Sequence, residues 1–123
     1  MGMYQTGNIK IFDDVVVPAG GSASSMSLDL SQLRTDNATL QLEVTGDGTA
    51  DFGYTLSNNG VDFMAADGVT NVIKASVTKT SGPASDGKIL INFTFKLAEA
   101  MKITVDEKGS TNPVTVNGWL VTR

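Results

Sequence analysis

Apolar and polar residues alternate with a period of two along most of this sequence. Leu40, Leu42 and Val44 alternate with polar neighbours in residues 38–45, and residues 101–107 repeat the pattern. Successive side chains of a β-strand point to opposite faces, so this period places one face of each strand in a core and the other in water. The pattern therefore predicts an all-β protein.

Turn-forming residues separate the alternating runs. Gly, Pro, Asn and Asp gather, for example, at residues 18–21, 46–48 and 81–87, where they supply unusual backbone angles or side chains that bond their own backbone. The 123 residues contain no linker or shift of composition, so we predict a single domain spanning residues 1–123. The expected strands lie at residues 9–17, 22–30, 38–45, 49–57, 61–65, 70–79, 88–97, 101–107 and 114–122.

About eight to nine short strands of this kind form a two-sheet antiparallel β-sandwich. We expect a jelly-roll-like order of strands, with an immunoglobulin-like order as the alternative, because both satisfy the same alternation. Residues 1–8 precede the first expected strand, and we expect them to form a flexible or partner-bound arm.

The dipeptide Asn59-Gly60 is typical of a two-residue type I′ turn between two strands. Such a turn pairs Asn58 with Val61 and places Leu56 opposite Phe63 on the same face. The register set by the turn agrees with the register set by the apolar residues. We therefore predict a tight hairpin at this point.

Histidine and cysteine are both absent from the sequence. The commonest general base and metal ligand is therefore missing, and neither a disulfide nor a thiolate metal site can form. We expect a protein that is not an enzyme, with no catalytic residue and no cofactor. Carboxylates in turns offer oxygen ligands to Ca²⁺, but no Asp-x-Asp-x-Asp-Gly loop occurs, and Asp is an ordinary turn residue. We expect no metal at these turn carboxylates, which are Asp47, Asp62, Asp67 and Asp86.

The charges are few and dispersed. Nine basic and thirteen acidic residues give a net charge of −4, and the lysines form no run, so nucleic acid is not an expected partner. The longest apolar run, Val15 to Ala19, is too short to span a bilayer. The first residues contain no basic segment followed by an apolar one, so neither a membrane partner nor a secretory signal is expected.

Two pairs of adjacent carboxylates, Asp13-Asp14 and Asp106-Glu107, lie near the ends of predicted strands. Neighbours in a strand point to opposite faces, so neither pair converges on one substrate atom. A glycosidase with two carboxylates needs such convergence. We expect all four residues to be solvated charges.

The last predicted strand, residues 114–122, is partly apolar on both faces. Gly118 and Leu120 point one way, while Asn117, Trp119 and Val121 point the other. This pattern fits a strand that is buried on both sides, or one whose second face meets a partner. We select Trp119, Val121 and Asn117 as the candidate interface.

Trp119 has a further interpretation as a platform on which a sugar ring stacks. Tyr4 and Tyr54 are the remaining amphipathic aromatic residues, and Tyr54 is predicted to point into the core. A stacking surface therefore has few members, which favours a core or subunit-interface role for Trp119 over sugar binding.

Three segments carry bend, hairpin and closing-strand features, and together they cover most of the chain. They are residues 15–31 with Ala19-Gly-Gly and Leu28-Asp-Leu-Ser, residues 52–63 with Ser57-Asn-Asn-Gly, and residues 97–105 followed by residues 112–120. In this order they resemble small β-sandwich proteins encoded by phages and prophages, of the virion accessory, head-decoration or tail type. Asn59 stands where Asp is common in the hairpin of that family.

The resemblance implies a non-catalytic structural or accessory protein of a virion, made in the cytoplasm of the bacterial host. Such a protein self-associates as a homo-oligomer and docks on other virion proteins. Carbohydrate-binding modules and adhesin domains share several of the same features, so a carbohydrate-binding β-sandwich is the alternative. Neither resemblance carries a catalytic residue to this sequence.

Overall fold

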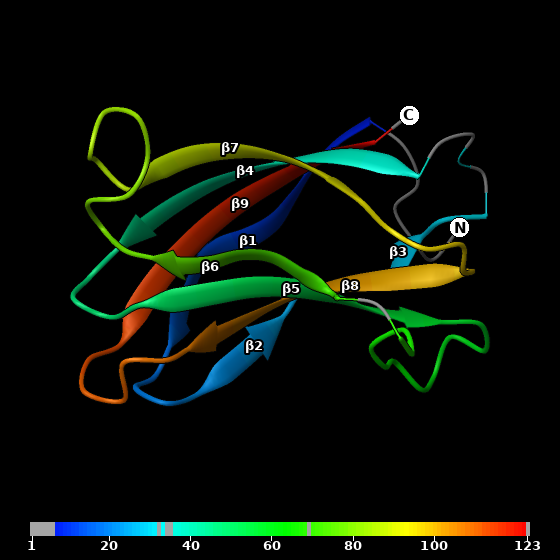
Figure 1. The fold of residues 1–123 in the computed structure, drawn as a ribbon, viewed down its shortest axis with the longest axis horizontal. Coiled ribbons are helices and arrows are strands. Elements are labelled where there is room, and N and C mark those ends of the chain that lie inside the picture. Colours follow the sequence, from blue (N-terminus) through cyan, green and yellow to red (C-terminus); the bar gives the residue numbers. More distant parts are fainter. Residues whose placement is uncertain (1–6, 32, 34–35, 69, 123) are drawn as a thin grey trace.

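The structure is a computed structural model that describes residues 7–31, 33, 36–68 and 70–122. The described residues form β-strands, turns and loops and contain no helix, which confirms the all-β prediction (Figure 1). The nine strands of the described residues are β1 (Gly7–Val17), β2 (Ser22–Ser24), β3 (Leu28–Asp29), β4 (Asn37–Thr45), β5 (Ala50–Ser57), β6 (Val72–Val77), β7 (Lys88–Thr94), β8 (Ala100–Glu107) and β9 (Val114–Thr122).

The strands form two antiparallel sheets that pack face to face (Figure 1). One sheet has the order β1-β9-β4-β7, and the other has the order β2-β8-β5-β6, with β3 also paired to β8. If β2 and β3 are taken as one interrupted strand, the first strand pairs with the last, the second with the last but one, and so on inward to β5 and β6. This nested pairing is a hairpin ribbon rolled into two sheets, which is a jelly roll. The structure thus decides for the jelly-roll order over the immunoglobulin-like alternative.

Most predicted strands are present with small shifts of their ends. Strand β1 begins at Gly7, so the last two residues of the predicted arm belong to a strand, and residues 1–6 lie outside the described residues. The expected strand 22–30 is interrupted between β2 and β3. The expected strand 61–65 is wrong, because only Met64 pairs with Leu56 in an isolated bridge.

The predicted type I′ turn at Asn59-Gly60 is also wrong. Leu56 exchanges backbone hydrogen bonds with Met64, of 2.8 and 3.0 Å, so the register is shifted by one residue from the predicted Leu56–Phe63 pair. A type I′ turn needs a positive φ at both central residues, and Gly60 has φ 75° whereas Asn59 is not among the residues with positive φ. The Asn59 side chain instead organises a wider loop.

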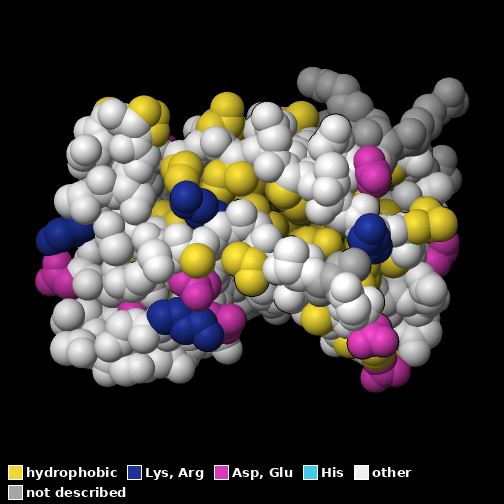
Figure 2. All heavy atoms as spheres, viewed as in Figure 1, with side chains coloured by type: hydrophobic (Ala, Val, Ile, Leu, Met, Phe, Trp, Pro, Cys, Tyr) yellow, Lys and Arg dark blue, Asp and Glu magenta, His cyan; other side chains and the backbone are white. Residues whose placement is uncertain are grey.

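The core lies between the sheets and is built from the inward-facing residues that alternation predicted. Along β4 and β9 every second residue is buried, and Leu40, Leu42 and Val116 are almost completely inaccessible. Tyr54 is buried as predicted. The inward residues of β7 are covered less well, because Ile89, Ile91 and Phe93 are only partly buried. Figure 2 shows hydrophobic side chains along this open side of the sandwich, between β7 and the β5–β6 pair.

Glu107 is 3% exposed, which contradicts the predicted solvated charge. Its Oε1 accepts N–H bonds from Gly20 (2.9 Å) and Ser110 (2.7 Å), and its Oε2 accepts N–H bonds from Thr49 (2.9 Å) and Gly109 (2.7 Å). The N–H groups of Thr49 and Gly20 are the main cause that lowers the pKa of the Glu107 carboxyl from 4.5 to about 2. The carboxylate therefore joins three loops at one end of the sandwich.

Within the described residues, no helix is long and apolar enough to cross a membrane.

Candidate functional site

The outer face of the β1-β9-β4-β7 sheet brings together residues that are far apart in the sequence. The strand register places Lys10 beside Trp119, Trp119 beside Gln41, and Gln41 beside Leu90. Side chains of directly paired residues lie on the same face of a sheet, so these four residues form one row across it. In this row Trp119 of β9 has Lys10 on one side and Gln41 on the other, and the exposed apolar Leu90 lies beyond Gln41.

Trp119 is half-buried at the centre of this face. The Nζ of Lys10 lies 5.1 Å from the centroid of the Trp119 ring, and it also lies 3.0 Å from Oδ1 of Asp13. A cation over an aromatic face is attracted by the ring, so Lys10 holds the ring against the sheet. The structure thus places Trp119 on the outward face of β9 and Leu120 on the buried face, a choice that the alternation had left open.

A shallow hollow of about 200 Å³ opens beside Trp119. Trp119 and Val121 line the hollow from β9, and Leu90, with 67% of its surface exposed, lines it from β7. On this face the Oγ1 of Thr39 donates a hydrogen bond of 2.8 Å to Oδ1 of Asn92. The residues that line the hollow are Asn8, Thr39, Gln41, Leu90, Trp119 and Val121.

Asn117 lies on the same face but is engaged in a bulge of β1. The Asp14 N–H donates to Oδ1 of Asn117, and Nδ2 of Asn117 donates to Oδ1 of Asp14, both at 2.9 Å. Asp14 has φ 49°, a left-handed conformation that a short polar side chain tolerates. Asn117 therefore supports the backbone next to Trp119, and its predicted contact with a partner stays a prediction.

Sequence reasoning selected the β9 residues of this face and missed the others. Gln41 and Leu90 also alternate outward in their own predicted strands, so their direction was visible in the sequence, whereas Asn8 was assigned to the arm before the first predicted strand. Their position beside Trp119 was not visible, because it depends on β1 and β4 flanking β9 and on β7 flanking β4. Tyr4, the other candidate aromatic residue, lies outside the described residues.

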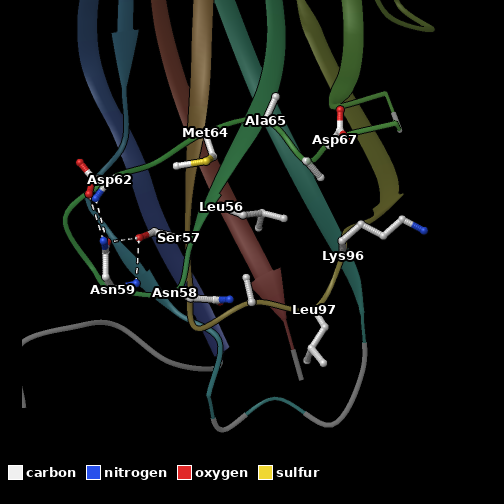
Figure 3. A pocket seen from close by; sticks show the side chains of 12 residues that line it. Leu56, Ser57, Asn58, Asn59, Asp62, Met64, Ala65, Asp67, Lys96 and Leu97 are labelled. Carbon is white, nitrogen blue, oxygen red and sulfur yellow. Dashed lines mark hydrogen bonds between the residues drawn. The ribbon is translucent and has the colours of Figure 1, made fainter.

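A larger hollow of about 520 Å³ lies at the end of the sandwich where β5 and β7 finish (Figure 3). Oδ1 of Asn59 accepts the N–H groups of Val61 and Asp62, both at 2.9 Å, and its Nδ2 donates to Oδ2 of Asp62 at 3.0 Å. Figure 3 shows this bonded loop on one side of the hollow and Lys96 on the other. The amide of Asn59 is therefore committed to shaping the loop.

The turn carboxylates have separate positions and partners in the fold. No group of three or more acidic side chains comes together among the residues the structure describes, so the turn carboxylates provide no ligand cluster for Ca²⁺ there. Asp47 pairs with Lys79, and Asp86 accepts the N–H of Lys88 at 3.1 Å. In the same residues each buried side-chain nitrogen or oxygen has a hydrogen-bond partner.

Neither a family model nor a curated protein sequence matches this chain. Solved structures share its fold. VP2 of infectious bursal disease virus, solved as a subviral particle, superimposes with a TM-score of 0.54 at 12% identity, over 94% of this chain and 32% of the VP2 chain. This chain thus spans about a third of the length of that viral protein.

Two smaller proteins match along nearly their whole length. PliG of Aeromonas hydrophila, a periplasmic inhibitor of g-type lysozyme, has a TM-score of 0.52 at 10% identity and covers 98% of this chain and 97% of its own. CsCBM6-3 of Clostridium stercorarium, solved in complex with cellobiose, has a TM-score of 0.50 at 16% identity and covers 98% and 96%. At identities this low, the superpositions show a shared β-sandwich fold alone, and one fold hosts many functions.

Proposed function

We propose that this protein is a non-catalytic structural or accessory component of a phage or prophage virion, which self-associates and docks on other virion proteins. The observation that carries the proposal is the outer face of the β1-β9-β4-β7 sheet, where Trp119, Val121 and Leu90 surround one hollow. An aromatic and aliphatic centre with an amide and hydroxyl rim is the usual composition of a protein interface. The similarity of fold to VP2 is compatible with this proposal.

If the protein docks through this face, we expect removal of the Trp119 side chain to weaken docking more than any other single change. Buried Trp residues are enriched among those that dominate binding energy, and Trp119 is the single tryptophan of the chain. We expect Trp119→Ala to reduce the amount of protein that co-purifies with particles by at least about tenfold. Particles prepared from a host that carries the gene, analysed by quantitative mass spectrometry, provide the measurement.

The matched control is Thr55→Ala, on the outer face of the other sheet, where Thr55 is paired with Lys102. This variant should join particles as well as the unchanged protein does. If Trp119→Ala joins particles as well as the unchanged protein does, the proposed face is not the docking surface. Absence of the unchanged protein from all particles would contradict the virion proposal itself.

Carbohydrate binding is the second candidate function, and the accessible position of Trp119 beside Gln41 and Asn8 favours it. A flat ring stacks on a sugar, and amide side chains hydrogen-bond sugar hydroxyl groups. Cellobiose is a suitable first probe, because CsCBM6-3 was solved with it. A saturable change of Trp119 fluorescence on titration would favour this function, and an unchanged spectrum at millimolar cellobiose would count against it.

A further inference from the structure

The two sheets present four edges, and three of them carry features that prevent pairing with another strand. Strand β1 has two register shifts, with Asp13 and Asp14 in its middle. Strand β6 also has two shifts, and it contains Lys74 and Ser76, whose φ is 58°. The third edge is divided between β2 and β3, of three and two residues. Bulges, charges and short strands are the devices by which proteins protect their sheet edges.

Strand β7 forms the fourth edge and, apart from Lys88 at its first position, carries none of these features. Its seven residues pair with β4 in an uninterrupted register from Lys88 to Thr94. Residues 89–94 contain neither a charge nor a proline, and none of residues 88–94 has a positive φ. An exposed, regular and apolar edge of this kind aggregates unless another strand covers it.

The backbone of β7 shows which groups are available. The Val44 N–H donates to the Gly87 carbonyl at 3.0 Å, and the Phe95 N–H donates to the Asp36 carbonyl at 2.9 Å. Backbone groups of an antiparallel strand alternate between its two sides, so odd-numbered residues of β7 face β4. The even-numbered residues therefore direct their N–H and C=O groups toward the open side. At Lys88 these groups are already covered, because its N–H donates to Oδ1 of Asp86 at 3.1 Å and Gly82 lies against its carbonyl. The residues with open backbone groups are Leu90, Asn92 and Thr94.

We propose that the β7 edge pairs antiparallel with the β7 edge of a second copy of this chain, around a two-fold axis at Ile91. In this register the open backbone groups of Leu90 in each copy meet those of Asn92 in the other. This inference rests on the proposed self-association and names the surface through which it occurs. The two four-stranded sheets then become one continuous sheet.

The side chains of β7 suit this arrangement. Ile89 of one copy lies beside Phe93 of the other, and the two Ile91 side chains meet at the axis. All three are only partly buried in the single chain, so pairing removes more apolar surface from water. The β7 edge borders the open side of the sandwich seen in Figure 2, so the second copy adds its strand along that side.

The charges near the ends of β7 are complementary in the same register. Asp86 and Lys96 lie two residues beyond its two ends, and both are exposed. Lys96 forms neither of the ion pairs found among the described residues. The antiparallel arrangement brings the end of β7 that carries Lys96 in each copy near the end that carries Asp86 in the other. The Oδ1 of Asp86 also accepts the N–H of Lys88 in its own chain at 3.1 Å. Opposite charges placed in this way favour antiparallel pairing in one register over its alternatives.

Single cysteines test the register, because the chain contains no cysteine of its own. Residues on the axis form a non-hydrogen-bonded pair with Cα atoms about 4.5 Å apart, within the range of a disulfide. Leu90 is 67% exposed, but the two Leu90 residues are displaced along the strands and their Cα atoms lie about 7–8 Å apart, beyond the usual range of a disulfide. Under mild oxidation we expect Ile91→Cys to form a covalent dimer at least about tenfold faster than Leu90→Cys.

Random collision predicts the reverse order, since Leu90 is the more accessible position. Equal or faster cross-linking of Leu90→Cys would therefore overturn the proposed register. A second variant keeps the test decisive if Ile91→Cys does not fold. Leu90→Lys places two positive charges near the axis, and we expect it to weaken dimerisation at least about tenfold in Kd. Its matched control is Val72→Lys on the protected β6 edge, where Val72 is 57% exposed.

Light scattering of the unchanged protein across a concentration series separates the two proposals. An oligomer that Leu90→Lys does not weaken and that Ile91→Cys does not cross-link would overturn the β7 interface and leave self-association standing. A monomer at every concentration would overturn both the interface and the self-association. Dimers that Leu90→Lys weakens and Val72→Lys does not would support the interface.

Discussion

At the scale of single residues, Glu107 shows how position changes the role of a side chain. In the sequence it is the second member of an acidic pair at the end of a strand, which is typical of a solvated charge. In the fold its carboxylate receives four backbone N–H groups from the segments around Gly20, Thr49 and Gly109. A carboxylate that accepts several such bonds is stabilised in its charged form.

The lowered pKa of Glu107 predicts how the stability of the fold depends on pH. Its folded pKa of about 2 lies below the ordinary 4.5, so the stabilising contribution is fully present above pH 4.5. Acid removes it progressively as pH falls toward 2, because the unfolded state takes up the proton first. We expect Glu107→Gln to lower the Tm at pH 7, where an amide replaces the charged acceptor.

The difference in Tm between Glu107→Gln and the unchanged protein should shrink between pH 4.5 and pH 2. Thermal unfolding followed by circular dichroism across this pH range provides the measurement. Asp106→Asn, at the neighbouring position on the outer face, is the control, and its Tm difference should not follow the same profile. A constant difference for Glu107→Gln over the whole range would contradict the role of its carboxylate.

At the scale of elements, the loop after β5 illustrates the competition between a tight turn and a side chain. Asn59-Gly60 satisfies the preferences of a type I′ turn, but Oδ1 of Asn59 accepts the N–H groups of Val61 and Asp62. Asn and Asp side chains offer the backbone such alternatives to sheet pairing. The result is a six-residue loop, 58–63, between Ser57 and Met64.

The loop after β5 should loosen locally when the donor of Asn59 is removed. Asn59→Asp keeps the oxygen acceptor, but it places a second carboxylate beside Asp62, whose Oδ2 lies 3.0 Å from Nδ2 of Asn59. We expect faster amide hydrogen exchange at Val61 and Asp62, with a loss of global stability of about 1 kcal/mol or less. Unchanged exchange at both amides would show that the Asn59 side chain does not hold the loop; Asn71→Asp, outside it, serves as the control.

At the scale of the whole molecule, the last strand lies near the centre of its sheet. Strand β9 pairs with β1 on one side and β4 on the other, so the sheet cannot close before the C-terminal residues arrive. Long-range pairing of this kind makes folding slow, on the order of milliseconds to seconds.

Removal of β9 should therefore abolish the whole fold and not only the part that β9 forms. A chain that ends at Pro113 loses the buried residues Val114, Val116 and Leu120 and leaves two strands without their central neighbour. We expect this chain to show no cooperative thermal unfolding by circular dichroism, while the full chain does. A cooperative transition in the shortened chain would contradict the central role assigned to β9.

The sequence by itself determined the direction of side chains along each strand. Alternation is a local property of the extended backbone, so Leu40 and Tyr54 could be assigned to the core and Trp119 to the face opposite that of Leu120. The same local information limited the prediction at Asn59, where the N–H groups of Val61 and Asp62 bond to the side chain of Asn59 and displace the expected turn. Strand 22–30 was likewise too long, because its interruption between β2 and β3 depends on pairing with β8.

Only the tertiary structure decided which strands are neighbours. The order β1-β9-β4-β7 places Trp119 between Lys10 and Gln41, which are 109 and 78 positions away in the sequence, and leaves β7 as an unprotected edge. It also gathers three loops around Glu107 and turns an apparent surface charge into a buried acceptor. Jelly-roll and immunoglobulin-like orders bury the same alternating residues, so alternation cannot choose between them. The choice is made when each strand finds the partner that satisfies its backbone hydrogen bonds and closes the core.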